Sequence, residues 1–364
     1  MKITEVETYV LTKPLERPLL TSRSDGRQRT HFLVRVVTDA GVTGLGESLG
    51  APGVLRAIVQ EHLTPRVVGA DPFDTAALYR RMVESDVLWD QKGALLCAAS
   101  AIEIACWDVK SKALGVPVWQ LLGGRLHDRL EAYASDLFWA APEAMARDAA
   151  RWAAQGFRIV KCHLGRLPPA EETARIRAMR EAIGPDVGLM IDLNCAYDYA
   201  QALEAARRWA ELDIFWLEEP LSPYLVDALA RLGEKTDIPI AAGENEFTVH
   251  GFKQLLDRGA VDFAMPDIGR AGGLGETQRI CALAAAYGVP VSPHNFASGV
   301  LLAATVHLMA STPGTKLLEY DVAGMSIGAE LLVEPLRIQD GHVLVPDVAG
   351  LGVELRDEVL SRYA

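Results

Sequence analysis

The chain has 364 residues, half of them hydrophobic, and its formal net charge at pH 7 is −12. This length suffices for a barrel with a smaller attached domain, and the hydrophobic content excludes a disordered chain. The acidic balance argues against nucleic acid and anionic membranes as partners, because both carry negative charge themselves.

Cysteine usage and the apolar stretches indicate where the protein works. Five scattered cysteines without a Cys-x-x-Cys pair are typical of free thiols in a reducing compartment. The first residues lack the apolar core of a signal peptide. The longest apolar stretch, residues 300–310, contains His307 and is too short to span a bilayer. We therefore expect a soluble, cytoplasmic protein.

Residues 1–125 have the mixed pattern of a small α+β domain. Alternating apolar residues from Ile3 to Val10 and a β-rich run from His31 to Thr38 predict two strands, with the polar stretch Thr21–Arg27 between them. A turn at Gly41–Gly44 leads into a third strand, which predicts a meander. Helical periodicity follows at Val54–Val67, Asp74–Val87 and Gly93–Leu114.

Residues 126–325 alternate between short apolar runs and helical segments, which is the pattern of repeated βα units. The predicted strands are Leu130–Ala134, Arg158–His163, Gly188–Asp192, Phe215–Glu218, Ile238–Ala241, Phe263–Met265, Val289–Ser292 and Lys316–Glu319. About eight units favour a closed barrel over a doubly wound sheet. No Gly-x-Gly-x-x-Gly follows an early strand, so a dinucleotide site is unsupported.

The tail, residues 326–364, contains two further strand-like runs, Leu336–Ile338 and His342–Val345. We expect this segment to return to the N-terminal domain and to pack against it. The predicted division is therefore 1–125, 126–325 and 326–364.

Three equally spaced carboxylates, Asp192, Glu218 and Glu244, each follow a short apolar run. Acids at the ends of neighbouring parallel strands meet at one rim of the sheet, where they repel each other. A hard divalent cation with oxygen ligands offsets that repulsion. A single Asp or Glu after a strand is more often a helix N-cap or a turn residue, so the prediction depends on the whole set.

Other ionisable groups stand at the ends of four of the five remaining predicted strands, where the active site of such a barrel is formed. Lys161 and His163 are two residues apart on one strand and therefore face the same side. Asp267 and His294 end the sixth and seventh strands, and a carboxylate beside an imidazole is the pairing expected of a general base. Glu319 ends the last strand.

These residues resemble the enolase superfamily and, within it, the mandelate racemase subgroup. The superfamily's use of a Lys or His base with Mg²⁺ is a known pattern. The resemblance covers nearly the whole chain and implies a modified (β/α)7β barrel of the TIM type, with an α+β capping domain built from the N-terminal region and the C-terminal tail. The motifs that carry it are Lys161-Cys162-His163, Ile191-Asp192-Leu193-Asn194, Leu217-Glu218-Glu219-Pro220, Gly243-Glu244-Asn245, Pro266-Asp267, Ser292-Pro293-His294 and Leu318-Glu319.

The resemblance also implies roles for these residues. It implies Mg²⁺ on the three carboxylates, a His294–Asp267 catalytic dyad and Glu319 as a hydrogen-bond donor to the substrate. Lys161 is implied at the substrate carboxylate, and Asn194 is expected as a further substrate contact. The family's usual Lys-x-Lys is Lys-x-His here, because His163 replaces the second lysine. That replacement argues against a racemisation mechanism that needs two bases.

The preferred interpretation is a sugar-acid dehydratase. His294 would take the proton α to the carboxylate, and a 3-hydroxyl would leave, which gives a 2-keto-3-deoxy acid. The alternatives are a racemase, epimerase or lactone cycloisomerase with His163 as second base, or a barrel that binds Mg²⁺ and an anion without turnover. Residues 21–27 are either a lid over the substrate or an ordinary loop. A homo-oligomer is expected from the family alone.

Overall fold

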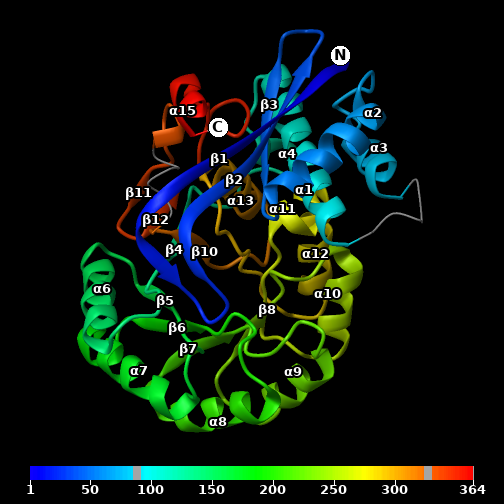
Figure 1. The fold of residues 1–364 in the computed structure, drawn as a ribbon. Coiled ribbons are helices and arrows are strands. Elements are labelled where there is room, and N and C mark those ends of the chain that lie inside the picture. The colour runs from blue at the N-terminus through cyan, green and yellow to red at the C-terminus, as the bar shows by residue number, and fades with distance from the viewer. Residues whose placement is uncertain (85–91, 324–329, 364) are drawn as a thin grey trace.

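The computed structural model describes residues 1–84, 92–323 and 330–363, and it has two parts (Figure 1). The first part begins with an antiparallel meander of β1 (Ile3–Leu20), β2 (Asp25–Thr38) and β3 (Thr43–Ser48), as predicted. The first two strands are longer than expected. They form one long hairpin whose connection is only residues 21–24, so residues 25–27 of the predicted polar stretch lie within β2.

Helices cover the meander on one side. The predicted helix Val54–Val67 consists of α1 (Pro52–Ala57), a π-helical turn (Ile58–Leu63) and α2 (Thr64–Val67). Pro65 lacks an N–H and its ring crowds the preceding turn, which accounts for the wider turn before it. The other helices of this part are α3 (Thr75–Tyr79) with a π-helical turn (Arg80–Glu84), α4 (Ala94–Leu114) and α5 (Val118–Leu121). Residues 85–87 of the second predicted helix lie outside the described residues.

The second part is a closed parallel barrel, which confirms the predicted fold class. Strand pairing runs in order from β4 to β9, and β10 pairs back with β4. The strands are β4 (Arg129–Ser135), β5 (Ile159–His163), β6 (Gly188–Asp192), β7 (Ile214–Glu218), β8 (Ile240–Ala242), β9 (Phe263–Ala264) and β10 (Leu318–Asp321). The helices are α6 (Pro142–Ala154), α7 (Pro169–Ile183), α8 (Tyr199–Trp209) with a 3₁₀ turn (Ala210–Leu212), α9 (Val226–Gly233), α10 (Thr248–Asp257), α11 (Ile268–Ala271), α12 (Gly273–Ala286) and α13 (Gly299–Ser311).

The predicted seventh strand, Val289–Ser292, is not a strand in the structure. Only Val291 forms β-bridges, to Ala264 on one side and Thr315 on the other. Prolines at 290 and 293 flank this position, and neither can donate a hydrogen bond to a neighbouring strand. The single bridge residue nevertheless joins β9 to the segment that leads into β10, so the barrel closes.

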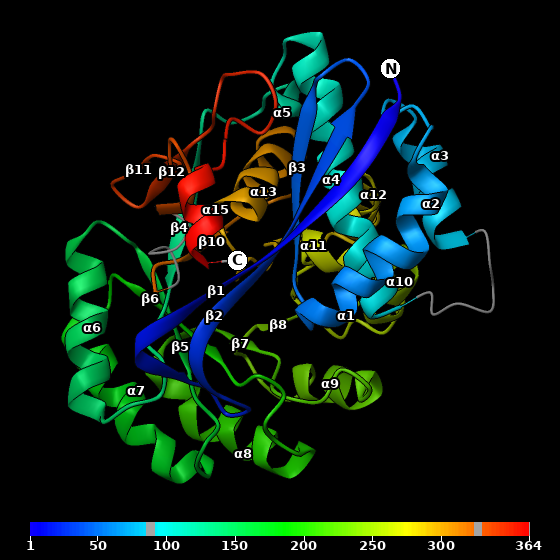
Figure 2. The same cartoon turned by 45° about the horizontal axis from the view of Figure 1, so that its top comes forward.

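The tail contacts both parts of the molecule (Figure 2). Its strands are β11 (Ile338–Gln339) and β12 (His342–Leu344), and β12 pairs antiparallel with β4 of the barrel. Its helix α15 (Asp357–Tyr363) lies against β1, and the Lys13 ammonium contacts the Glu330 carboxylate at 2.8 Å. The division into segments at residues 125 and 325 stays a prediction.

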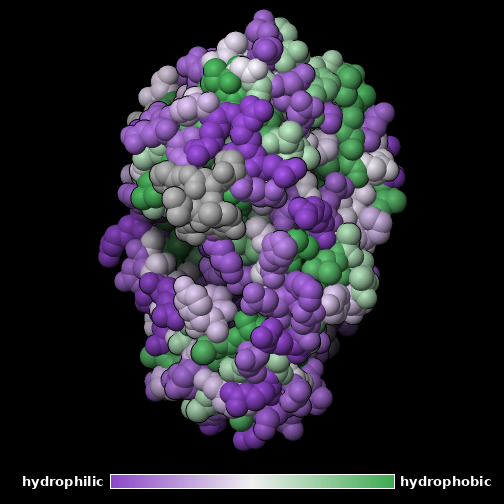
Figure 3. Space-filling view, turned by 90° about the vertical axis from the view of Figure 1, so that its right-hand side faces the viewer, coloured by the Kyte–Doolittle hydropathy of each residue, from purple (hydrophilic) through white to green (hydrophobic). Residues whose placement is uncertain are grey.

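Helix α13 is buried on all sides, which is why its sequence is apolar without a polar face. Within the described residues, no helix combines the length and the apolar character needed to cross a membrane. On the face shown in Figure 3, hydrophilic residues predominate and hydrophobic residues lie in small groups among them.

His307 is a structural histidine at the centre of α13. Its Nδ1 accepts a hydrogen bond from the backbone N–H of Trp119 at 3.2 Å, and its Nε2 lies 3.1 Å from the carbonyl oxygen of Leu351. The neutral ring with the proton on Nε2 satisfies both contacts. Burial lowers the pKa of His307 to about 4.

This pKa makes the stability of the fold depend on pH. The unfolded chain binds the proton more tightly, with a pKa of about 6.5. Above that pH the His307 contribution is complete, and it decreases as the pH falls from about 6.5 towards 4. We predict that His307→Gln removes a slope of about 1.4 kcal/mol per pH unit in this window. Urea unfolding of both proteins at pH 7.5, 6.0 and 5.0 measures it, and two parallel pH profiles would contradict it.

Candidate active site

Three carboxylates from neighbouring strands converge at the C-terminal rim of the barrel. Asp192 ends β6 and Glu218 ends β7, and the two residues are opposite each other in the parallel pairing. Glu244 follows β8 after Gly243, whose φ of +136° and closeness to Phe252 leave no room for a side chain. One oxygen from each carboxylate lies within 4.8 Å of the others. The structure thus brings together the three acids that the sequence singled out.

The carboxylates carry a strong mutual repulsion, because they are close together and largely shielded from water. Burial raises the pKa of Glu218 well above its usual range; Lys161 opposes this shift, and Asp192 adds to it. Burial also raises the pKa of Glu244. A hard divalent cation such as Mg²⁺ prefers oxygen ligands, carboxylates among them, and its charge would offset the repulsion. The donor set therefore fits the expected ion.

His294 and Asp267 form a close pair on one side of the carboxylates. The His294 Nδ1 is 2.6 Å from an Asp267 oxygen, and its Nε2 is 3.3 Å from a Glu244 oxygen. The other Asp267 oxygen accepts a hydrogen bond from the backbone N–H of Gly269 at 2.8 Å. Burial disfavours the imidazolium, but Glu244, Glu319 and Asp267 outweigh it and raise the pKa of His294 to about 10. A cation that offsets the charge of Glu244 would lower this pKa.

Lys161 lies on β5, two residues before the end of the strand, and its ammonium links Glu218 to Glu319. Its ammonium is 2.7 Å from a Glu218 oxygen and 2.7 Å from a Glu319 oxygen. Burial disfavours its charge, but the two carboxylates outweigh burial and hold the pKa of Lys161 well above its usual range. Lys161 is therefore a fixed positive charge within the barrel.

The Glu319 carboxylate is surrounded by hydrogen-bond donors, whereas the sequence led us to expect that it donates a hydrogen bond to the substrate. It accepts hydrogen bonds from Lys161, from the Ser135 hydroxyl at 2.7 Å and from the backbone N–H of Asn295 at 2.9 Å. Burial favours protonation, but Lys161 and His294 outweigh it and lower the pKa of Glu319. A donor role would require a proton on Glu319, and these neighbours oppose it.

His163 and Asn194 both contact the metal-site candidate Asp192. The His163 Nδ1 lies 3.2 Å from an Asp192 oxygen, and the Asn194 side chain donates to the same oxygen at 2.8 Å. The Phe138 ring stacks on His163 with ring centres 4.5 Å apart and planes 6° from parallel. The His163 Nε2 is buried and has no hydrogen-bond partner among the described residues. In this arrangement the His163 ring contacts the Asp192 carboxylate and helps to hold it in position.

A second layer of polar residues lies behind the carboxylates and was not predicted. The Glu219 carboxylate accepts hydrogen bonds from the Asn245 amide at 2.6 Å and from the Cys195 thiol at 2.9 Å. Burial, followed by the charge of Glu244, raises the pKa of Glu219 to about 8. Glu219 and Asn245 directly follow two metal-site candidates, so the residue after each strand-end acid is the signal that could have found them.

Ser135 was also missed, although it ends the first barrel strand. It was overlooked because a serine does not ionise, while its hydroxyl contacts Glu319. Arg29 on β2 and Glu47 and Ser48 on β3 also contact the segments around the site. They could not be found in this way, because they lie far from these segments in the sequence.

The tip of the β1–β2 hairpin lies against the segment that follows β6 (Figure 1). The Ser22 hydroxyl donates to the carbonyl oxygen of Leu193 at 2.9 Å, and the Arg23 guanidinium donates to the carbonyl oxygens of Asn194 and Cys195. Arg166 contacts Asp25 on the same hairpin. The polar stretch therefore covers the rim beside Asn194.

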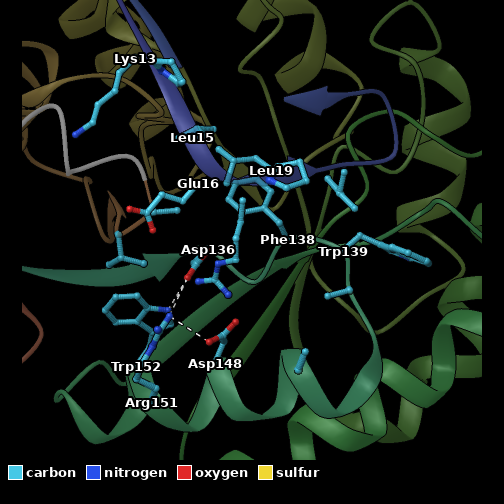
Figure 4. Close-up of a pocket in the computed structure, with 18 residues that line it drawn as sticks. Lys13, Leu15, Glu16, Leu19, Asp136, Phe138, Trp139, Asp148, Arg151 and Trp152 are labelled. Carbon is cyan, nitrogen blue, oxygen red and sulfur yellow. Dashed lines mark hydrogen bonds and ion pairs between the residues drawn. The ribbon is translucent and has the colours of Figure 1, made fainter. Parts of the chain in front are cut away.

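A cavity of about 620 Å³ lies beside this site, between β1 and the β4–α6 segment (Figure 4). None of the predicted site residues lines it. Phe138, which stacks on His163, is part of its wall. We place the chemistry at the carboxylates, because the predicted site residues converge there and none of them lines this cavity.

Family models match the chain over most of its length. Residues 4–123 match the N-terminal domain of the mandelate racemase / muconate lactonizing enzyme family, and residues 144–359 match the enolase C-terminal domain-like family. The chain therefore belongs to the enolase superfamily, in its mandelate racemase subgroup.

Known relatives span the same length. The D-galactarolactone cycloisomerase of Agrobacterium fabrum is 35% identical over 100% of this chain and 99% of its own length. The D-xylonate dehydratase of Haloferax volcanii is 33% identical over 89% of this chain and 83% of its own length. The crystal structure of a racemase from Streptomyces coelicolor with bound magnesium has a TM-score of 0.92 and 29% identity, with coverage of 100% of this chain and 99% of that one.

The carboxylate cluster leads to a prediction about metal binding. Glu244→Gln keeps the shape of the side chain and removes one of the three charges. We expect the Mg²⁺ affinity to fall by at least about tenfold, because a charged ligand is lost. Isothermal titration calorimetry measures the affinity, and Asp257→Asn on the surface is the control. An unchanged affinity would contradict the three-acid site.

Proposed function

We propose that this protein is a Mg²⁺-dependent enzyme that removes the proton α to the carboxylate of a sugar acid and then eliminates the oxygen substituent at the β carbon. The observation that carries the proposal is the orientation of His294. Its Nδ1 is held by Asp267 at 2.6 Å, and its Nε2 points towards Glu244 at 3.3 Å. A base is thus aimed at a cluster that suits a metal ion.

In this proposal Asp192, Glu218 and Glu244 would hold the ion. When bound, Mg²⁺ would supply the positive charge that stabilises an enediolate. The set of three oxygen ligands and the magnesium in the Streptomyces coelicolor neighbour support this choice.

His294 is the proton carrier of the proposed reaction. Its Nε2 accepts the α proton, and the electrons of the broken C–H bond form the enediolate. These electrons then form the double bond between the α and β carbons while the β C–O bond breaks. The imidazolium of His294 can return its proton to the leaving oxygen on the same face. The enol product becomes a 2-keto-3-deoxy acid.

Other residues position the substrate. Lys161 supplies a permanent positive charge beside the carboxylate cluster, which suits it to the substrate carboxylate. Glu319 keeps Lys161 in place, and it could donate to the substrate only after it gained a proton. Asn194 contacts Asp192 and lies under the hairpin tip, so we assign it to orientation of Asp192 and of the bound acid.

The arrangement of His163 gives no support to a two-base reaction. One ring nitrogen faces Asp192 and the other is buried, while Phe138 covers a face of the ring. A base on the opposite face of the substrate needs a nitrogen that is open to the site. We therefore prefer elimination to racemisation or epimerisation, and we assign His163 to the support of Asp192.

The leaving group separates two candidates within elimination. A dehydratase expels a hydroxyl, which needs the proton from His294. A cycloisomerase opens a ring, because the departing oxygen stays attached through the rest of the sugar. The dehydratase is our first proposal. The full-length match to a galactarolactone cycloisomerase specifically favours the second candidate.

A substrate panel tests the proposal. We expect that incubation with Mg²⁺ and a set of aldonic acids, aldaric acids and aldarolactones yields a 2-keto-3-deoxy acid from at least one of them. Carbonyl trapping detects the product, and ¹H NMR in D₂O shows whether water was lost or a ring was opened. Deuterium at the α carbon with inversion and without elimination would instead establish an epimerase.

His294→Asn tests the assigned base. Asn keeps a polar side chain beside Asp267 but cannot accept the proton. We expect kcat to fall by about a thousandfold or more, which is the usual size of such a contribution. Circular dichroism and Mg²⁺ titration should match the unmodified protein. Substantial remaining activity would exclude His294 as the base.

A further inference from the structure

The first part of the fold, called the cap from here on, contacts the loop that carries His294 through two of its strands, β2 and β3. The Glu47 side chain on β3 is fully buried and lies at the first turn of α13. One of its oxygens accepts hydrogen bonds from the His31 Nδ1 and the Ser298 backbone N–H, each at 2.9 Å. The other accepts from the Ser298 hydroxyl at 2.6 Å and the Leu301 backbone N–H at 3.0 Å. Glu47 therefore determines where α13 begins, because it binds the N-cap residue Ser298, four residues after His294.

Arg29 on β2 makes a second buried contact with the same region. Its guanidinium lies 3.6 Å above the centre of the Phe296 ring and donates to the Phe296 carbonyl oxygen at 3.4 Å. It also forms a buried ion pair with Asp321, two residues after Glu319. Arg29 thus joins the segment after His294 to the end of β10.

A third contact reaches the partner of His294. The Ser48 hydroxyl at the end of β3 donates to the carbonyl oxygen of Gly269 at 2.7 Å. The N–H of Gly269 in turn donates to Asp267. Each segment that follows Asp267, His294 or Glu319 is consequently tied to a cap strand through a buried polar side chain.

We propose that Glu47 and Arg29 are positioning residues that set the geometry of the His294–Asp267 pair from the cap. This inference rests on the proposed function of His294 as the base. The residues do not touch the reacting atoms. They act on the backbone of residues 295–301, which connects the base to α13.

The physical reason is that proton transfer tolerates little displacement of the reacting groups. A segment between a strand and a helix moves readily unless its backbone groups are held. A buried carboxylate at a helix N-terminus makes short, charge-assisted hydrogen bonds and fixes that turn firmly. A shift of about 1 Å in a reacting group can cost about a hundredfold in rate. Contacts four residues away can therefore control catalysis without taking part in it.

Glu47→Gln is the direct test. Each oxygen of Glu47 faces two donors, so the amide nitrogen of Gln would meet donors at either position and force the α13 turn to shift. We expect kcat to fall by about tenfold to a hundredfold. We expect KM and Mg²⁺ affinity to change by less than about twofold, because the carboxylates on β6, β7 and β8 are untouched.

A spectroscopic readout separates this inference from the proposed reaction. In protein labelled with ¹⁵N-histidine, the Nδ1–H of His294 reports its hydrogen bond to Asp267, and no substrate is needed. We expect this resonance to shift or broaden in Glu47→Gln. If no sugar acid is turned over but the resonance responds, the reaction assignment has failed and the positioning inference stands.

Asp108→Asn is the matched control. Asp108 is a buried carboxylate of the cap that accepts hydrogen bonds from the backbone N–H groups of Leu45 and Leu351. In the part of the chain that the structure describes, it forms no hydrogen bond or ion pair with residues 293–301. This variant should lose stability and keep both kcat and the His294 resonance. If Asp108→Asn lowers kcat as much as Glu47→Gln does, a general loss of stability explains the effect and the inference is wrong.

A milder variant covers the case in which Glu47→Gln does not fold. Ser298→Ala removes only the hydroxyl that donates to Glu47 at 2.6 Å. We expect a smaller change in the same direction, with the His294 resonance shifted and KM retained. Arg29→Lys, which keeps the charge but loses the stacking on Phe296, should behave likewise. An unchanged His294 resonance in both variants would overturn the proposal.

Discussion

The repulsion among Asp192, Glu218 and Glu244 is the constraint on which the rest of the site depends. The barrel holds their oxygens within 4.8 Å of one another, where burial leaves little water to screen them. Lys161 offsets part of this charge from below and His294 from the side. The same excess of negative charge that is costly in the protein alone creates the affinity for a divalent cation. Stability and cofactor binding are thus opposed at these three residues.

The cap contributes more than a cover. Its strands supply Arg29, Glu47 and Ser48, whose buried polar groups reach the segments that follow β9, Val291 and β10. Buried polar groups must be satisfied, so these contacts also fix how the two parts fit together. A barrel built from the same strands without the cap would lack the partners for the loop that carries His294.

Several departures from the predicted elements have simple local causes. Pro290 and Pro293 reduce the seventh strand to a single bridge at Val291, and Pro65 interrupts a helix that periodicity alone made continuous. The prolines are visible in the sequence, but the periodicity of apolar residues takes no account of them. The hairpin of β1 and β2 extends further than alternation suggested, because its tip is paired within itself and rests on residues 193–195. That support comes from the barrel and leaves no local signal.

The sequence by itself determined the barrel, the strand ends and the three acids, because parallel strands place their C-terminal residues at one rim whatever the details of packing. It also indicated that His294 and Asp267 are neighbours, since they follow consecutive predicted strands, although the second of these is only a single bridge at Val291 in the structure. Only the tertiary structure decided what these groups contact. Glu319 is an acceptor because Lys161, Ser135 and Asn295 surround it, and His163 faces Asp192 because Phe138 covers its ring. Protonation and accessibility depend on such neighbours, and most of these neighbours lie on other strands of the chain.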